Sequence, residues 1–147
     1  RSRGLGDVYK RQEDYGIPVR PEYVVQGDYV YQGGYRGIHE LWKLNEKPTA
    51  VFVTNYDMSM GAMEAIYDLE IRIPQQLSVA VFDDFELSVM VNPNLTSVRQ
   101  PLVELADAAC ELLLRRMNGD ESDYPKRIRL KPSCIYRESV QNLNSSQ

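Results

Sequence analysis

Several residue types that carry common protein chemistry are scarce in this chain of 147 residues. It has one histidine and two cysteines, Cys110 and Cys134, with no CxxC pair, which excludes a zinc finger and a disulfide-dense scaffold. No apolar run approaches the roughly 20 residues that span a bilayer. The formal net charge of −4 gives no overall basic surface for nucleic acid. We therefore expect a cytoplasmic globular protein with reduced thiols, no metal and no cofactor.

Enzyme motifs are missing as well. The glycines of residues 27–37 do not form GxGxxG, and the serines lack the spacing of a nucleophile elbow. His39 has no second ligand or nucleophile near it in the sequence, and we interpret it as a surface residue. Asp83 and Asp84 resemble the acidic cluster of a phosphoreceiver, but the chain lacks the second acidic pair and the lysine that a receiver needs. We predict that the protein is not an enzyme.

The first twelve residues, RSRGLGDVYKRQ, differ from the rest. They carry four basic residues and one acidic residue, with no helical or alternating period. They closely resemble translated sequencing-adapter read-through at the ends of assembled gene fragments, and the alternative is a natural basic arm such as the end of a helix. We predict that residues 1–12 are a non-native scar and expect the natural N-terminus to lie outside this sequence.

Beyond the scar, strand-like and helix-like segments alternate. Continuous apolar runs at 50–54 and 77–82 are typical of strands buried on both faces. Further strands are predicted at 23–26, 95–99, 127–130 and 134–137. Helical spacing of apolar residues predicts helices at 34–45, 58–69, 85–91 and 101–118. This alternation indicates an α/β fold with a parallel sheet and helices on both faces.

Polar residues follow three of these strands, as Gly27-Asp28-Tyr29, Thr54-Asn55-Tyr56-Asp57 and Asp83-Asp84. Ligands of open parallel sheets bind beyond the carboxyl ends of the strands, and a ring, an amide and a carboxylate together suit a polyol. Aspartate and asparagine also cap the helices that follow strands. The pattern alone leaves caps and ligand contacts equally open, and we interpret Asp57 and Asp84 as caps.

Four sequence blocks, taken in order, resemble one known family. They are KPTAVFVTNYDMSMGAM at 47–63, IPQQLSVAVFDDFE at 73–86, NLTSVRQP at 94–101 and IYRES at 135–139. Together they resemble the lactose-repressor and purine-repressor family of bacterial transcription regulators over roughly residues 13–140. Tyr56 departs from the family, which usually has Asp or Asn there, so we expect capping to shift to Asp57.

The resemblance implies a type I periplasmic-binding-protein-like fold, in which two α/β subdomains enclose an effector. Residues 13–140 would form an effector-binding fragment, mostly the C-terminal subdomain. Residues 101–119 would be a helix of the N-terminal subdomain, which is otherwise absent. We expect that helix to expose an apolar stripe or to fold back non-natively. A polar tail begins at Ser139, and we expect residues 141–147 to be disordered.

The same resemblance implies the function and the site. Asn55 and Asp83 would bind the effector, Tyr29 would stack on it, and Gln100 would lie near the hinge. The effector would be a sugar or sugar derivative that changes how a homodimeric repressor binds DNA. Operator DNA would be contacted only through a helix-turn-helix that this sequence lacks, and no membrane partner is expected. The alternative is the periplasmic sugar-binding protein of a transporter, which shares the fold.

Overall fold

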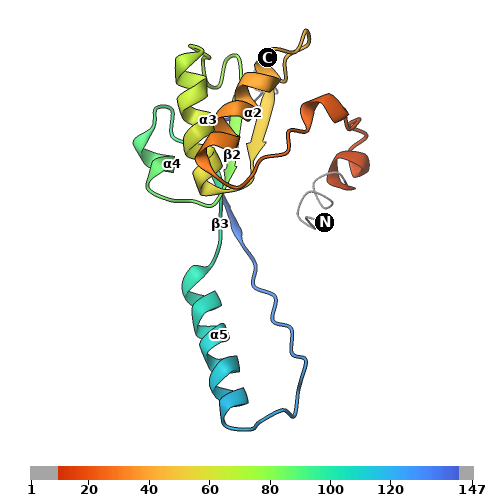
Figure 1. The fold of residues 1–147 in the computed structure, drawn as a ribbon, viewed down its shortest axis with the longest axis vertical. Helices are drawn as coiled ribbons and strands as arrows, with labels where there is room; N and C mark the ends of the chain where they lie inside the picture. The colour runs from red at the N-terminus through yellow and green to blue at the C-terminus, as the bar shows by residue number, and fades with distance from the viewer. Residues whose placement is uncertain (1–9, 143–147) are drawn as a thin grey trace.

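An open four-stranded sheet forms the centre of the protein in a computed structural model that describes residues 10–142 (Figure 1). The strands β1 (Ala50–Val53), β2 (Ser78–Phe82), β3 (Thr96–Arg99) and β4 (Ser133–Ile135) lie in that order. The first three are parallel, and β4 pairs antiparallel with β3 at the sheet edge. The predicted α/β class is confirmed. The predictions for residues 1–9 and 143–147 fall outside the described residues.

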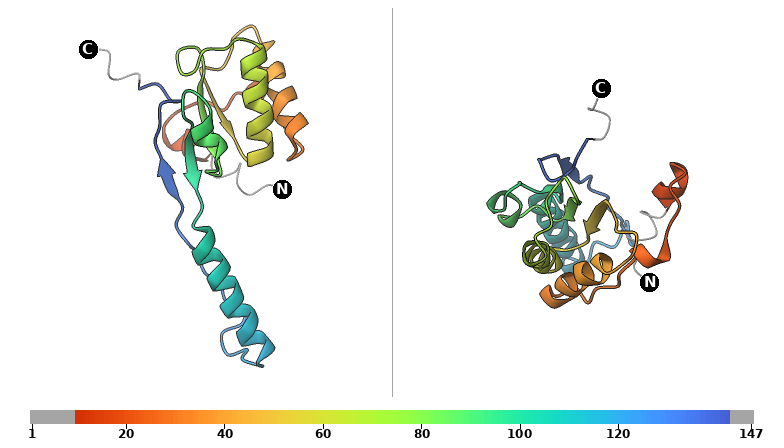
Figure 2. Two further views of the ribbon diagram at one scale, coloured as in Figure 1. Left: turned by 90° about the vertical axis from the view of Figure 1, so that its left-hand side faces the viewer. Right: turned by 90° about the horizontal axis from the view of Figure 1, so that it is seen from above.

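Two helices, α2 (Tyr31–Trp42) and α3 (Tyr56–Asp68), pack together against one face of this sheet (Figure 2). Their apolar residues meet alternate residues of the strands to form the core, which includes Ile38, Ala62, Ala65, Ile66, Val53, Val79, Val81 and Leu95. Apolar residues recur three and four positions apart along α3, which turns them toward the sheet and drives this packing by removing apolar surface from water.

The other side of β1 is not covered in the same way. Ala50 is exposed and Phe52 is 39% exposed, whereas Val53 is buried. Successive side chains of a strand point to opposite faces, and α2 and α3 cover only one of them. The prediction that this strand is buried on both faces is therefore wrong for the described residues.

Two predicted strands are absent. The segment predicted at 23–26 contains the end of a short 3₁₀ helix, η1 (Pro21–Tyr23), followed by extended residues without a ladder partner. Residues 127–130 lie in the connection that returns alongside α5 (Leu102–Met117), where the neighbouring element is a helix (Figure 1). A strand needs a second strand to satisfy its backbone groups, so a β-rich composition alone was insufficient in both places.

Helix α5 extends away from the sheet (Figure 1). None of its residues is buried, and six large apolar side chains are exposed: Leu102, Val103, Leu105, Leu113, Leu114 and Met117. This confirms the predicted exposed apolar stripe. Helix α4 (Leu87–Met90) is a single turn between β2 and β3. No helix within residues 10–142 is long and apolar enough to cross a membrane.

Ser139 joins the end of the chain to the sheet instead of beginning a solvated tail. It is fully buried, its hydroxyl donates to the carbonyl of Val79, and its Oγ accepts from the amide of Thr96 at 2.8 Å. The amide of Val79 in turn donates to the Ser139 carbonyl at 2.8 Å. These bonds attach the closing segment to the beginnings of β2 and β3, at the end of the strands opposite to the polar residues that follow them.

Candidate functional site

The carboxyl ends of β1, β2 and β3 lie at one edge of the sheet, because the three strands are parallel. Asn55, Asp83 and Gln100 follow these ends in turn. The structure brings Asp83 and Gln100 into direct contact: Nε2 of Gln100 donates to Oδ1 of Asp83 at 2.6 Å. Two residues that were predicted for the site, and that lie 17 positions apart in the sequence, therefore form one hydrogen-bonded pair.

Asp83 adopts an uncommon backbone conformation. Its φ is +79°, and its amide donates to the carbonyl of Val98 at 3.0 Å. A non-glycine residue at positive φ costs about 1–3 kcal/mol and persists where its surroundings hold it. Such conformations are concentrated at functional sites, and here the conformation presents a carboxylate beside Gln100.

Asn55 has two roles, and both anchor the protein's own chain. Its Oδ1 accepts from the amide of Met58 at 3.2 Å, which makes Asn55 the N-cap of α3. Its Nδ2 donates to the carbonyl of Tyr29 at 3.0 Å. Tyr29 has a φ of +62°, and the residue is 62% exposed. The prediction that Asp57 takes over the cap is wrong, because Asn55 itself fits the position before the first turn.

The two pairs lie along one edge but not in one pocket. Asp83 and Gln100 line a depression of about 510 Å³, whose lining also includes Asp84, Phe85, Arg99, Pro101, Leu102 and Lys131. Tyr29 and Asn55 are not part of its lining. The rings of Tyr56 and Phe85 connect the two parts, meeting edge to face with centroids 4.8 Å apart. The four predicted site residues thus form two hydrogen-bonded pairs joined by an aromatic contact.

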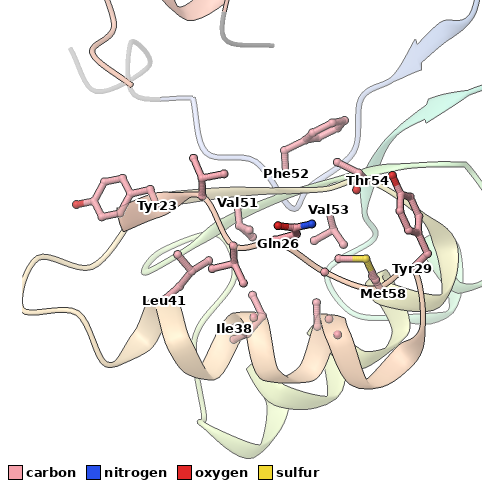
Figure 3. A pocket seen from close by; sticks show the side chains of 17 residues that line it. Tyr23, Gln26, Tyr29, Ile38, Leu41, Val51, Phe52, Val53, Thr54 and Met58 are labelled. Atoms are coloured by element: carbon pink, nitrogen blue, oxygen red, sulfur yellow. The ribbon is translucent and has the colours of Figure 1, made fainter. Parts of the chain in front are cut away.

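Tyr29 lines a second, smaller cavity of about 200 Å³, which separates the segment 23–27 from β1 and α2. Figure 3 shows Tyr29 at one end and Tyr23 at the other, with Gln26 between. The remaining walls are mainly apolar, from Ile38, Leu41, Val51, Val53 and Met58. This cavity occupies the space where a strand at 23–26 would have paired with β1.

Asp84 is not a helix cap, contrary to prediction. Its side chain is 4% exposed. Oδ1 accepts from Arg137 at 2.7 Å and from the hydroxyl of Ser97 at 2.6 Å, and Oδ2 accepts from Nε of Arg99 at 2.8 Å. The hydrogen bond from Arg137, reinforced by those from Ser97 and Arg99, holds the pKa of Asp84 well below its usual value despite the opposing effect of burial.

Sequence reasoning missed this cluster because its members lie 13, 15 and 53 residues from Asp84. A local sequence pattern cannot predict a contact between residues that are this far apart in the sequence. One signal was available: Arg137 lies in the closing block IYRES, an arginine in an otherwise uncharged stretch between Cys134 and Glu138. A charged residue in such a stretch calls for a partner of opposite sign.

Other polar residues have structural surroundings. His39 is half-buried rather than on the open surface, with its ring 4.6 Å from that of Tyr35. Asp28 pairs with Arg36 at 2.7 Å, and this contact lowers the pKa of the carboxyl. Cys110 and Cys134 are free and exposed. Within residues 10–142, no three acidic, histidine or cysteine side chains are arranged to hold a metal ion.

The fold is an open α/β sheet with polar residues at the carboxyl ends of its parallel strands. The profile of the periplasmic binding protein-like domain matches residues 5–140, and the chain belongs to that family. Among curated proteins, it is 38% identical over 131 residues to catabolite control protein A of Priestia megaterium, covering 85% of this chain and 40% of that protein. It is 36% identical over 127 residues to the ribose operon repressor of Haemophilus influenzae, covering 86% of this chain and 38% of that protein.

Solved structures agree. A regulatory protein of the LacI family from Chloroflexus aggregans has a TM-score of 0.81 and 30% identity, over 93% of this chain and 49% of that one. A LacI-family regulator from Enterococcus faecium, solved with bound ribose, has a TM-score of 0.79 and 26% identity, over 90% of this chain and 48% of that one. The predicted resemblance to LacI-type (lactose-repressor-type) regulators is confirmed. The chain spans about two fifths of the length of these curated relatives.

Proposed function

We propose that this chain is the effector-sensing part of a LacI-type DNA-binding transcriptional repressor, and that its effector is a sugar or sugar derivative. The observation that carries the proposal is the Asp83–Gln100 pair at the ends of β2 and β3, facing an open depression. Ligands of open α/β sheets bind at this edge. The curated relatives are repressors and a catabolite control protein, which favours a regulator over the transporter alternative.

The chemistry of the depression favours a neutral polyhydroxy ligand. Gln100 occupies Oδ1 of Asp83, and Oδ2 has no partner within the described residues, so it is available to accept from a ligand hydroxyl. The lining includes three acidic and two basic side chains. Asp84 is one of the acids, and Arg137, which is not part of the lining, forms an ion pair with it, so that acidic and basic charges are equal. A site with balanced charge offers no strong attraction to a sugar acid or a sugar phosphate.

In the intact repressor, the effector would lie between this subdomain and a second one. Binding there would bias the closure of the two subdomains and so alter the DNA-binding geometry of a homodimer. Operator DNA would be bound by a helix-turn-helix outside this sequence. The chain's own residues would bind and orient the effector in the cytoplasm without catalysis, cofactor or membrane.

The test uses the intact gene product, purified and titrated with D-ribose, other sugars, sugar acids and purines. We expect a neutral sugar to bind and to change operator affinity in a mobility-shift assay. Asp83→Ala removes a charged hydrogen-bond acceptor and should weaken that binding by at least about tenfold with little change in melting temperature.

The matched control is Glu40→Ala, which removes an exposed acid near the end of α2, far from the strand ends. Unchanged sugar affinity in Asp83→Ala would remove Asp83 from the site. Operator binding that no member of the panel alters would contradict the proposed function.

A further inference from the structure

We propose that Asp84 and Arg137 are positioning residues for this site: their buried ion pair holds Asp83 in the backbone conformation from which its carboxylate meets Gln100. The link to an effector rests on the proposed function, but the positioning itself does not. Asp84 also lines the depression, but Arg137, Ser97 and Arg99 already occupy both of its carboxylate oxygens, so in this proposal both residues act through Asp83.

The backbone of Asp83 is fixed from both sides. On one side, its amide bonds to the carbonyl of Val98, which continues the pairing of β2 with β3. On the other side, the next residue is Asp84, whose side chain is buried and fully engaged. A left-handed residue returns readily to the β or α region when its neighbours are free to move. Here both neighbours are held, so Asp83 stays at a φ of +79°.

Two consecutive carboxylates face two consecutive side chains at the end of β3. Asp84 accepts from Arg99 at 2.8 Å, and Asp83 accepts from Gln100 at 2.6 Å. The side chains of Asp83 and Asp84 point in different directions, each toward its own partner at the end of β3. Because one peptide joins the two residues, the direction of the Asp84 side chain sets that of Asp83. If Asp84 turned outward, the peptide between them would rotate and Asp83 would leave Gln100.

Arg137 determines which way Asp84 turns. Its Nη1 lies 2.7 Å from Oδ1 of Asp84, 2.6 Å from the carbonyl of Leu95 and 2.9 Å from Oγ of Ser97. The Arg137 side chain is only 13% exposed, so water cannot readily replace these contacts. A single guanidinium thus connects the closing segment, β3 and the end of β2. Without it, Asp84 would be a charged carboxylate with its strongest buried partner removed, and it would move toward solvent.

The experiment uses NMR on the 147-residue chain and needs no ligand. The side-chain amide of Gln100 reports the hydrogen bond through its proton exchange. The intraresidue amide–Hα NOE of Asp83 reports φ, because these two hydrogens lie closest together at positive φ. In Arg137→Met, we expect Gln100 side-chain exchange to be at least tenfold faster and the Asp83 NOE to lose the intensity of a left-handed residue. Arg137→Lys, which keeps the charge, should restore both signals in part.

A matched control is Arg115→Met. Arg115 pairs with Asp120 and Asp123 at the far end of α5, so this variant makes the same substitution in another ion cluster. It should leave Gln100 and Asp83 unchanged. Ser97→Ala, which removes one weaker donor to Asp84, gives a milder version of the change should Arg137→Met fail to fold.

Folded Arg137→Met and Ser97→Ala proteins with wild-type signals at both residues would overturn the proposal. D-ribose titrated into the intact protein separates the two hypotheses. Changed NMR signals in the variants, with no sugar response even in the wild type, would leave the positioning intact and count against the proposed function alone.

Discussion

The backbone of Gly34 in α2 lies directly against the carbonyl of Met58 in α3. A Cβ placed on Gly34 would be 1.9 Å from that oxygen, which is too close for two non-bonded atoms. Gly61 of α3 stands in the same relation to Tyr31, with a distance of 2.0 Å from its Cβ position to the carbonyl oxygen. The two helices therefore meet backbone to backbone at the edge where Tyr29 and Asn55 lie, and glycine is required for this contact.

Gly34→Ala should lower the free energy of unfolding by about 1–3 kcal/mol, the usual cost of overpacking, because the helices must move apart. Gly37→Ala is the matched control on the same helix: its Cβ would meet Val25 at an ordinary 3.5 Å. That variant should be neutral or up to about 1 kcal/mol more stable, since alanine favours a helix over glycine. Urea unfolding measures both. Equal effects of the two substitutions would contradict the close contact.

Asn55→Ala should lose the cap of α3, worth about 1 kcal/mol, and also release the Tyr29 loop. Asn55→Asp separates these roles, because aspartate still accepts from Met58 but cannot donate to the carbonyl of Tyr29. We expect near wild-type stability for Asn55→Asp together with faster proteolysis near Tyr29. Urea unfolding and limited proteolysis test this, and an unchanged cleavage rate would show that Asn55 does not anchor the loop.

Asp84 makes stability depend on pH. Its pKa is lowered in the folded protein, whereas in the unfolded chain it returns to about 3.9. The stabilisation is therefore fully present above that value and declines as the pH falls toward the lower pKa of the folded state, because the unfolded chain binds the proton first. When melting temperatures are measured between pH 6 and 2, we expect them to decrease once the pH is below about 4. Asp84→Asn should start less stable and show a shallower fall; an equally steep fall would assign it to other carboxyls.

The exposed apolar residues of α5 should make the 147-residue chain self-associate. Leu113→Lys together with Met117→Lys removes two of them, each more than 60% exposed. We expect less association in light scattering and less binding of a hydrophobic dye, with unfolding of the sheet unchanged because no residue of α5 is buried. A large loss of stability would show that α5 packs on the rest of the protein.

The sequence predicted those elements whose signal is local. The helix at 58–69 is present as α3 (Tyr56–Asp68), since its apolar spacing and its asparagine cap lie within a few residues of each other. The strands at 77–82 and 95–99 are present for the same reason. The segment at 23–26 has a similar composition but no neighbouring strand among the described residues to pair with, and composition alone does not predict strand pairing.

For the candidate site, the sequence named its residues but not their relationships. Asn55 and Asp83 follow strands, so their place at one sheet edge was predictable from parallel topology alone. In the structure Gln100 bonds to Asp83, while Asn55 bonds to the backbone of Tyr29. These pairings depend on the directions of the side chains, which cannot be predicted from sequence spacing.

The amino-acid sequence by itself determined the α/β class, the order of the helices and strands from α2 to α5, and the polar residues at the strand ends, because periodicity and turn chemistry act over a few neighbouring residues. Only the tertiary structure decided that Asp83 keeps one carboxylate oxygen in the depression without a partner among residues 10–142, whereas both oxygens of Asp84 are engaged by a buried cluster. That choice is made by Ser97, Arg99 and Arg137, which the folded sheet brings to Asp84 from distant parts of the chain.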